Sequence, residues 1–175
     1  MLVNINDIFK FYETRLLCHV RSVNYFASLL GYSFPEHDGD KTDEPIRSGY
    51  AYIVYNEYHP QLHLVREYFD LCENAKRDHH NHSTHHIPYY TDVSKIPDLR
   101  LYEMISDWAS ANFEQKNILN DPNAIGLEQW FDNNMANHPW TEHQIKLIKK
   151  SFDVIREKTD YDVAKSIWNA LPGLV

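Results

Sequence analysis

Apolar residues recur every three or four positions over most of this chain, a period typical of amphipathic helices. The first stripe consists of Leu16, Val20, Val23, Phe26 and Leu30. It predicts a helix over residues 8–30 that stops at Gly31. Pro60 is typical of a first helical position and begins a second clear helix, which runs toward His80. The apolar side of that helix is marked by Leu62, Val65, Phe69 and Cys72.

The rest of the chain follows the same pattern, apart from an irregular, histidine-rich loop expected over residues 81–95. Asp98 is placed to cap a helix that runs to about residue 117. Thr141 and Gln144 resemble a capping box at the start of a later helix. Two further helices are expected over residues 125–137 and 161–170.

Residues 48–58 are rich in tyrosine and suit a helix or a strand, and we favour a helix because the neighbouring segments are helical. The five glycines also fit long regular elements. We therefore predict an all-α bundle of roughly six to eight helices by pattern counting. The expected organisation is one domain over residues 1–175, with a motif-bearing core at about 16–116 and C-terminal helices at about 125–170.

Composition narrows the classes of function. The formal charge of −8, without a long basic run, argues against a partner of duplex nucleic acid. The sequence shows neither a signal-peptide pattern nor an apolar run of membrane-spanning length, and its two cysteines suggest no disulfide framework. A cytoplasmic location without membrane association is therefore expected. The unusual feature is the set of 11 histidines, most of them between His19 and His86.

Two polar residues lie on or beside apolar helix faces. His19 lies on the stripe of the first helix, and Asp107 borders the inward face of its own helix. Buried polar groups need partners. His19 is either a core histidine bonded to an oxygen or a metal ligand, and Asp107 is either a ligand or part of a salt bridge to Arg15 or Arg100.

Adjacent His37 and Asp38 can both reach one cation only from a bend or a helix end, because neighbouring residues in a helix point about 100° apart. Residues 79–86 form a tract with five histidines in eight positions, and such a bias in composition is typical of metal binding. His80 and either His85 or His86 are expected to converge from different directions. In a helical bundle, all these groups can meet in one pocket. Their nitrogen and carboxylate ligands suit one or two ions of Zn²⁺, Fe²⁺, Mn²⁺, Co²⁺ or Ni²⁺.

The order of these residues resembles the signature of the HD superfamily of metal-dependent phosphohydrolases, which have an all-α fold. That signature is a histidine, a His-Asp pair and a distal aspartate, matched here by His19, His37, Asp38 and Asp107. With Lys41 the pair also matches the His-Asp-x-x-Lys form of two-metal branches. The chain looks most like an uncharacterised HD-like family of bacteria and tailed phages that adds a double-His, spacer, double-His motif. An origin in a phage would make the expected location the host cytoplasm.

The resemblance implies a ligand set and a reaction. His19, His37, Asp38 and Asp107 would hold a first metal, and Asp38 would bridge to a second metal held by His80 with His85 or His86. The implied reaction is hydrolysis of a phosphoester by a metal-activated water, on a nucleotide or a related small phosphometabolite. Lys41 would stabilise negative charge on the phosphate, or else be a surface lysine paired with Asp40 or Glu44.

Two other classes of function remain open. Some HD-fold proteins use the same ligand order and lysine in a di-iron oxygenase. The 12 tyrosines and 4 tryptophans would also suit a non-catalytic, metal-stabilised interaction protein, including a homo-oligomer.

Overall fold

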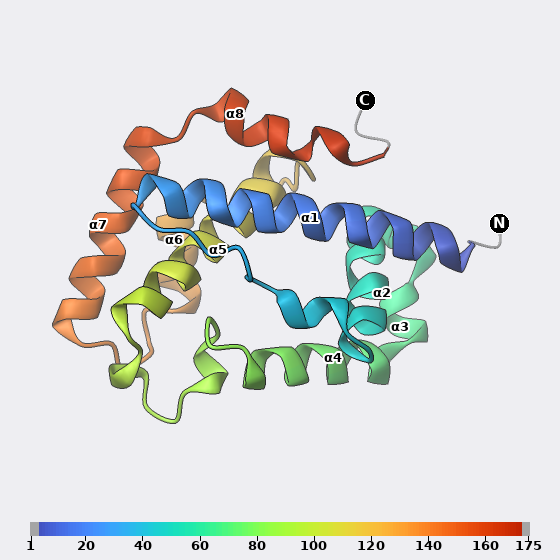
Figure 1. Ribbon diagram of the computed structural model, residues 1–175, viewed down its shortest axis with the longest axis horizontal. Helices are drawn as coiled ribbons and strands as arrows, with labels where there is room; N and C mark the ends of the chain where they lie inside the picture. The colour runs from blue at the N-terminus through green and yellow to red at the C-terminus, as the bar shows by residue number, and fades with distance from the viewer. Residues whose placement is uncertain (1–3, 173–175) are drawn as a thin grey trace.

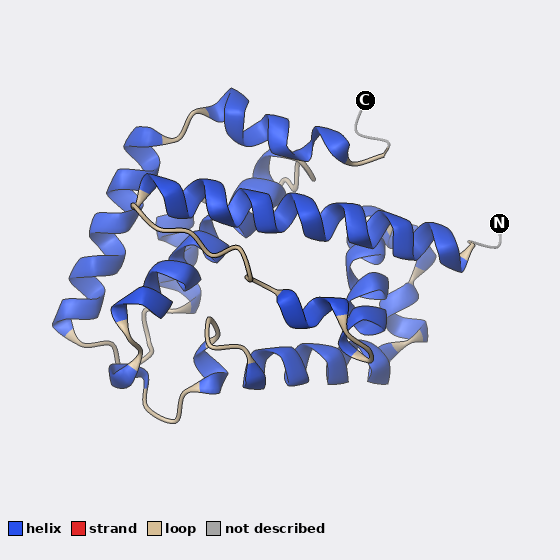
Figure 2. Cartoon of the chain, viewed as in Figure 1, coloured by secondary structure: helices blue, strands red, loops and turns tan. Residues whose placement is uncertain are grey.

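The computed structural model describes residues 4–172, and within that range it contains eight α-helices and no strand (Figure 2). The α-helices are α1 (Ile5–Leu29), α2 (Ile46–Tyr58), α3 (Leu64–Glu67), α4 (Phe69–His82), α5 (Asp98–Asn117), α6 (Leu127–Asn134), α7 (Glu142–Lys158) and α8 (Tyr161–Ser166). Short 3₁₀ helices lie at Gly39–Thr42, Pro60–Leu62, Ile87–Tyr89, Val93–Lys95 and Ile167–Ala170. The predicted all-α bundle of six to eight helices is confirmed.

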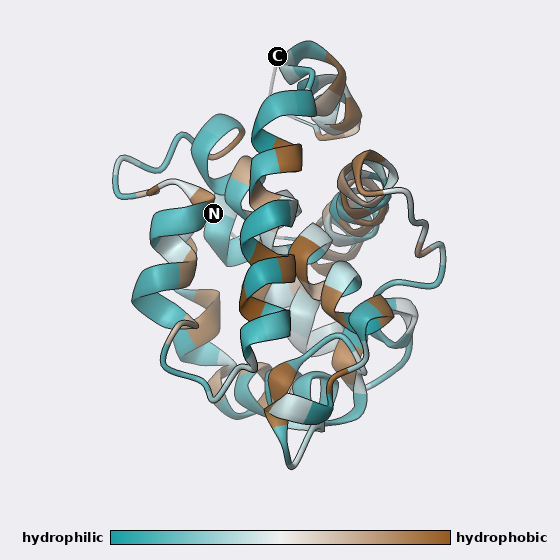
Figure 3. Ribbon diagram, turned by 90° about the vertical axis from the view of Figure 1, so that its left-hand side faces the viewer, coloured by the Kyte–Doolittle hydropathy of each residue, from teal (hydrophilic) through white to brown (hydrophobic). Residues whose placement is uncertain are grey.

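Helix α1 is the central element, and it packs against α2, α5, α7 and the 3₁₀ helix at the end of the chain (Figure 1). Its apolar stripe faces these neighbours, and it includes Tyr12, Val23 and Phe26, each at most 2 % exposed. The helix ends as predicted at Gly31, whose φ of 89° lies in the left-handed region that glycine favours. Most of the buried apolar side chains of the described helices form one contiguous core. Apolar and polar residues alternate along these helices (Figure 3).

The predicted helix from Pro60 to His80 is interrupted. His63 adopts a left-handed conformation and Tyr68 leaves helical geometry, so that the segment divides into a 3₁₀ turn, α3 and α4. The change of direction turns Phe69 outward, and this residue is 57 % exposed although its position predicted burial. Helix α4 then continues into the expected loop and ends only at His82.

The remaining predicted elements need smaller corrections. The favoured helix over residues 48–58 is confirmed as α2, and Thr141 and Gln144 form the predicted capping box of α7. Asp98 does not cap α5: it is the first helical residue, after Pro97, and its carboxylate contacts His143. No helix within residues 4–172 has the length and hydropathy needed to cross a bilayer.

Helices α2 and α4 approach each other closely at Gly49. A Cβ atom added at Gly49 would lie 2.3 Å from the Cβ of Ala75 and 2.7 Å from the carbonyl oxygen of Leu71. Real Cβ atoms do not approach so closely, so only glycine fits at this crossing. The contact lies one turn before His79 and therefore sets the position of the C-terminal half of α4.

We predict that Gly49→Ala lowers the free energy of unfolding by about 1–3 kcal/mol, because the added methyl group overpacks the crossing of α2 and α4. Urea unfolding followed by circular dichroism measures the change. Gly39→Ala is the matched control, since a Cβ there meets nothing within 4 Å. It should leave stability unchanged or raise it by up to about 1 kcal/mol. Equal effects of the two substitutions would contradict the close approach.

Candidate metal centre

The polar residues singled out along the sequence meet on the inward side of α1, α4 and α5. Helix α1 supplies His19, α5 supplies Asp107, and the segment between α1 and α2 supplies the His37–Asp38 pair. His79 comes from the last turns of α4, and His85 and His86 from the chain that follows it. All but Asp107 and His86 are buried, and these two are partly exposed.

The backbone at Asp38 explains how two adjacent side chains reach one point. Asp38 has φ 61° and ψ 20°, a left-handed conformation that non-glycine residues rarely adopt. It directly precedes the 3₁₀ helix Gly39–Thr42, so the chain bends sharply between the pair and that helix. The predicted bend at the His-Asp pair is therefore present, and the strain is concentrated at the residue that touches most of the cluster.

A first set of ligand atoms gathers around Asp107. Its Oδ1 lies 3.1 Å from Nε2 of His19 and 3.6 Å from Nε2 of His37. Oδ2 of Asp38 lies 3.4 Å from the same nitrogen of His19. The ligand atoms of His19, His37 and Asp107 lie close enough together to hold one ion, and Asp38 adjoins them. Neither predicted salt bridge of Asp107 forms, because Arg15 pairs with Glu114 and Arg100 pairs with Glu103.

A second set surrounds the other oxygen of Asp38. Its Oδ1 lies 3.3 Å from Nε2 of His79 and 3.3 Å from Nε2 of His85. Nε2 of His86 lies 2.8 Å from Nε2 of His79. The ligand atoms of these four residues lie close enough together to surround one ion. Asp38 therefore faces both sets: Oδ2 lies near His19, and Oδ1 lies near His79 and His85 and 3.7 Å from Nε2 of His37.

His79 takes the place that sequence reasoning assigned to His80. The buried positions of α4 are Cys72, Ala75 and His79, at spacings of three and four, so the apolar stripe leads to His79. His80 follows His79 directly and therefore lies off the apolar stripe of α4. It is partly buried, and the centre of its ring lies 4.3 Å from the centre of the His86 ring. His85 and His86 both join the second set, where the sequence left open which of them would do so.

Three buried atoms at the centre have no hydrogen-bond partner within the described chain: Nε2 of His37, Oδ1 of Asp38 and Nε2 of His85. A buried polar atom without a partner costs about 1–3 kcal/mol, and such atoms rarely gather in one place. Divalent cations held by the two sets would satisfy them. Imidazole nitrogens and carboxylates suit Zn²⁺, Fe²⁺, Mn²⁺, Co²⁺ or Ni²⁺, so the residues present fit the ions expected from the sequence.

In three of these imidazoles the outer nitrogen, Nδ1, which faces away from the cluster, has a partner that the sequence motifs did not reveal. Nδ1 of His79 donates to Oδ2 of Asp40 over 2.8 Å, and Nδ1 of His19 lies 3.3 Å from the hydroxyl of Ser110. Nδ1 of His37 contacts Glu103. Such outer partners fix which ring nitrogen faces inward. Asp107, Glu103 and Ser110 lie at helical spacing on α5, and this polar stripe is the signal that was missed.

Lys41 is not the surface lysine that one prediction allowed. It is 8 % exposed, and its Nζ donates to Oδ2 of Asp38 over 2.8 Å. The ammonium also lies 4.4 Å from the centre of the Tyr50 ring. It does not pair with Asp40 or Glu44, and it places a positive charge beside the carboxylate that both sets share.

The pKa values follow from these contacts. Burial opposes charge on His37, but the carboxylates of Asp38, Asp107 and Glu103 raise its pKa to about 10. Burial also opposes charge on Asp38, yet Lys41 and His37 hold its pKa well below the usual range. His80 behaves in the opposite way, since burial and the charge of His79 lower its pKa to about 4.

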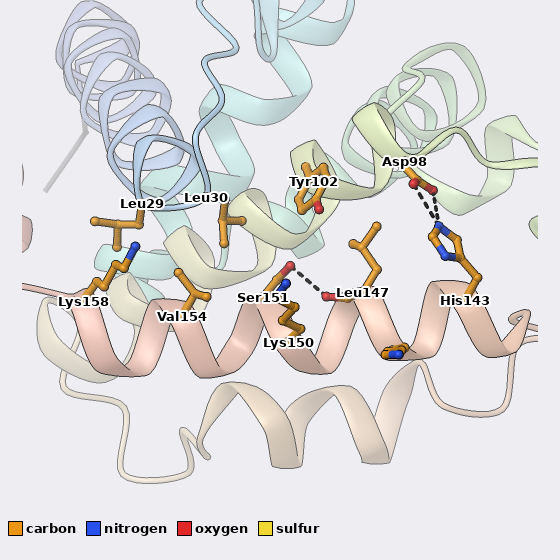
Figure 4. Close-up of a pocket in the computed structure, with 11 residues that line it drawn as sticks. Leu29, Leu30, Asp98, Tyr102, His143, Leu147, Lys150, Ser151, Val154 and Lys158 are labelled. Atoms are coloured by element: carbon orange, nitrogen blue, oxygen red, sulfur yellow. Dashed lines mark hydrogen bonds and ion pairs between the residues drawn. The ribbon is translucent and has the colours of Figure 1, made fainter.

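A hollow of about 490 Å³ opens next to the cluster. Residues 33–40 and 82–85 line it together with Arg100 and Glu103. A second hollow of about 490 Å³ lies between α7 and the ends of α1 and α5, with Lys150, Leu147 and Tyr102 on its walls (Figure 4). None of the residues of the metal cluster lines it, and its His143 is paired with Asp98.

The fold and the site define an all-α protein with a mostly buried histidine–carboxylate cluster whose donor atoms are compatible with divalent cations. Residues 9–160 match the profile of a protein family of unknown function, DUF5662, and the chain belongs to that family. Comparisons with curated proteins and with solved structures found no match.

We predict that the metal-free protein is most stable near about pH 6.5. The raised pKa of His37 contributes stability that is complete below its unfolded value of about 6.5 and is lost as the pH rises through about 10. The lowered pKa of His80 contributes stability that is lost as the pH falls from about 6.5 toward about 4. Urea unfolding in the presence of a chelator, at acidic, neutral and alkaline pH, measures both trends. His37→Gln should remove the alkaline loss, and stability that rises steadily from neutral to alkaline pH would contradict the assignment.

Proposed function

We propose that this protein is a metal-dependent phosphohydrolase related to the HD superfamily. The observation that supports the proposal most is that His19, His37, Asp38 and Asp107 lie together, with 3.1–3.7 Å between their ligand atoms, beside three buried atoms that have no hydrogen-bond partner in the described chain. These are the residues whose order matches the HD signature. A chance scatter of histidines along a helical protein would not bring that ordered set together.

The two ligand sets support a binuclear centre. His19, His37 and Asp107 would hold one ion, His79, His85 and His86 the other, and Asp38 would contact both. Bound divalent cations would lower the pKa of water toward neutrality and polarise a phosphoryl oxygen. The outer partners of the imidazoles favour a proton on the outer ring nitrogen, so that a bound cation would meet the inward nitrogen of each ring.

Lys41 and Arg100 are the positive side chains suited to an anionic substrate. Lys41 lies beside Asp38 and is assigned the stabilisation of negative charge that develops on the phosphate. Arg100 lines the adjoining hollow with its side chain 39 % exposed. The hollow is open and of modest size, which fits a nucleotide or a related small phosphometabolite as the substrate class.

A di-iron oxygenase is the second candidate. The same residues are compatible with it: Asp38 between the two sets, the six other candidate ligands, and Lys41 beside Asp38. Anaerobic iron loading followed by a change of the absorption spectrum on addition of oxygen would favour oxygenase chemistry. Full phosphoesterase activity with Mn²⁺ or Co²⁺ under anaerobic conditions would exclude it.

We predict that protein purified without a tag binds two equivalents of divalent metal. Asp38→Asn should lose both ions, whereas Asp107→Asn should lose only the first and His86→Ala only the second. Metal analysis after dialysis gives the stoichiometry, and circular dichroism shows that each variant is folded. The exposed His143 provides the control, because His143→Ala should still bind two. One equivalent in the wild type would favour a single four-ligand site, and none would contradict the proposal.

We predict hydrolysis of at least one member of a broad nucleotide and phosphoester panel by the metal-loaded protein. Lys41→Met should lower kcat by about 100-fold while metal content is retained, since it removes the positive charge assigned to stabilise the reacting phosphate. Lys76→Met is the control, because the Lys76 side chain is 42 % exposed and pairs with Glu73 on the surface. An inactive wild type with two bound metals would exclude the phosphohydrolase and favour the oxygenase or a structural metal.

A further inference from the structure

Glu103 touches both ligand sets from outside. It is 4 % exposed and lies on α5, one turn before Asp107. Its Oε1 lies 3.1 Å from Nδ1 of His37 and 3.6 Å from Nδ1 of His85. His37 belongs to the first set and His85 to the second. One carboxylate oxygen therefore faces an imidazole of each.

The two imidazoles lie between two carboxylates. Their rings are 4.2 Å apart, and their Nε2 atoms face Oδ1 of Asp38 at 3.7 Å and 3.3 Å. Their Nδ1 atoms face Glu103. Because a carboxylate only accepts hydrogen bonds, Glu103 favours a proton on Nδ1 of His37, and its negative charge at 3.6 Å favours a proton on Nδ1 of His85, so that Nε2 of each ring is the atom directed at the cluster.

Arg100 holds Glu103 in this position. Its Nη1 donates to Oε2 of Glu103 over 2.7 Å. Oε2 is therefore paired with Arg100, while Oε1 faces the two imidazoles. A surface pair at this helical spacing would contribute only about 0.2–0.5 kcal/mol and would not need a buried carboxylate. The burial of Glu103 against two imidazoles indicates a function beyond stabilising α5.

We propose that Glu103 is a positioning residue that orients one imidazole in each metal site and thereby couples the filling of the two sites. The inference rests on the proposed binuclear centre. When one cation binds and fixes His37, the same Oε1 of Glu103 is held in the position from which it also orients His85, so the second site is bound with less reorganisation. Removing the carboxylate charge should therefore weaken both sites rather than one.

Metal titration of Glu103→Gln against the wild type tests the proposal, with Zn²⁺ as the probe and calorimetry as the readout. Loss of an outer partner of a ligating histidine typically lowers metal affinity about 10–100-fold, and we expect a loss of this size at both sites. Glu114→Gln is the matched control. Glu114 is also buried on α5 and also pairs with an arginine, but its hydrogen bonds go to Arg15 and Tyr58 and to none of the imidazoles of the two sets. It should leave both affinities unchanged.

Nuclear magnetic resonance of the zinc-loaded protein gives a readout that a purely structural role would not change. In the wild type, the Nδ1 protons of His37 and His85 should be protected from exchange with solvent, and in Glu103→Gln both should exchange faster. If Glu103→Gln does not fold, Arg100→Gln replaces it, because it frees Glu103 without altering the histidines. A smaller loss of affinity at both sites is then expected.

The possible failures are distinguishable. A wild type that binds no zinc, or one equivalent, overturns the binuclear centre and the coupling with it. A wild type that binds two equivalents, combined with a Glu103→Gln protein that loses affinity at one site or at neither, overturns the coupling alone.

Discussion

The structure depends on the burial of one carboxylate. Asp38 is 3 % exposed, and four imidazoles and one ammonium lie within 2.8–3.7 Å of its oxygens. An ionised carboxylate in the interior is strongly unfavourable unless other charges and hydrogen bonds compensate it. These groups come from α1, from α4, from the chain after α4 and from the segment between α1 and α2. Each of these elements therefore has to lie where its polar group reaches the carboxylate of Asp38.

The packing of the apolar core brings these elements to the carboxylate. Helix α1 lies against α5, which places His19 opposite Asp107, and the glycine crossing of α2 and α4 brings His79 near Asp38. Two turns further along α5, Arg15 and Tyr58 bond to the buried Glu114. The polar side of α5 thus has two separate buried carboxylate networks, one at the cluster and one that only joins helices.

Much of this was predictable because helical period and motif order are local properties of a sequence. The stripe of α1, the stop at Gly31 and the capping box at Thr141 all follow from short-range patterns, and the structure shows each of them. The error at His80 came from following the doubled-histidine motif instead of the helix period, which leads from Cys72 to His79. The break at Tyr68 and the role of Glu103 were not predictable in this way. Both depend on contacts between segments that are distant in the sequence.

The most direct test is anomalous diffraction from crystals of the protein loaded with Zn²⁺ or Mn²⁺. The account predicts two anomalous peaks on either side of the Asp38 carboxylate, about 3.5–4 Å apart as in other two-metal sites. One peak should lie beside His19, His37 and Asp107, and the other beside His79, His85 and His86. Peaks confined to surface histidines, or no peak at Asp38, would contradict it.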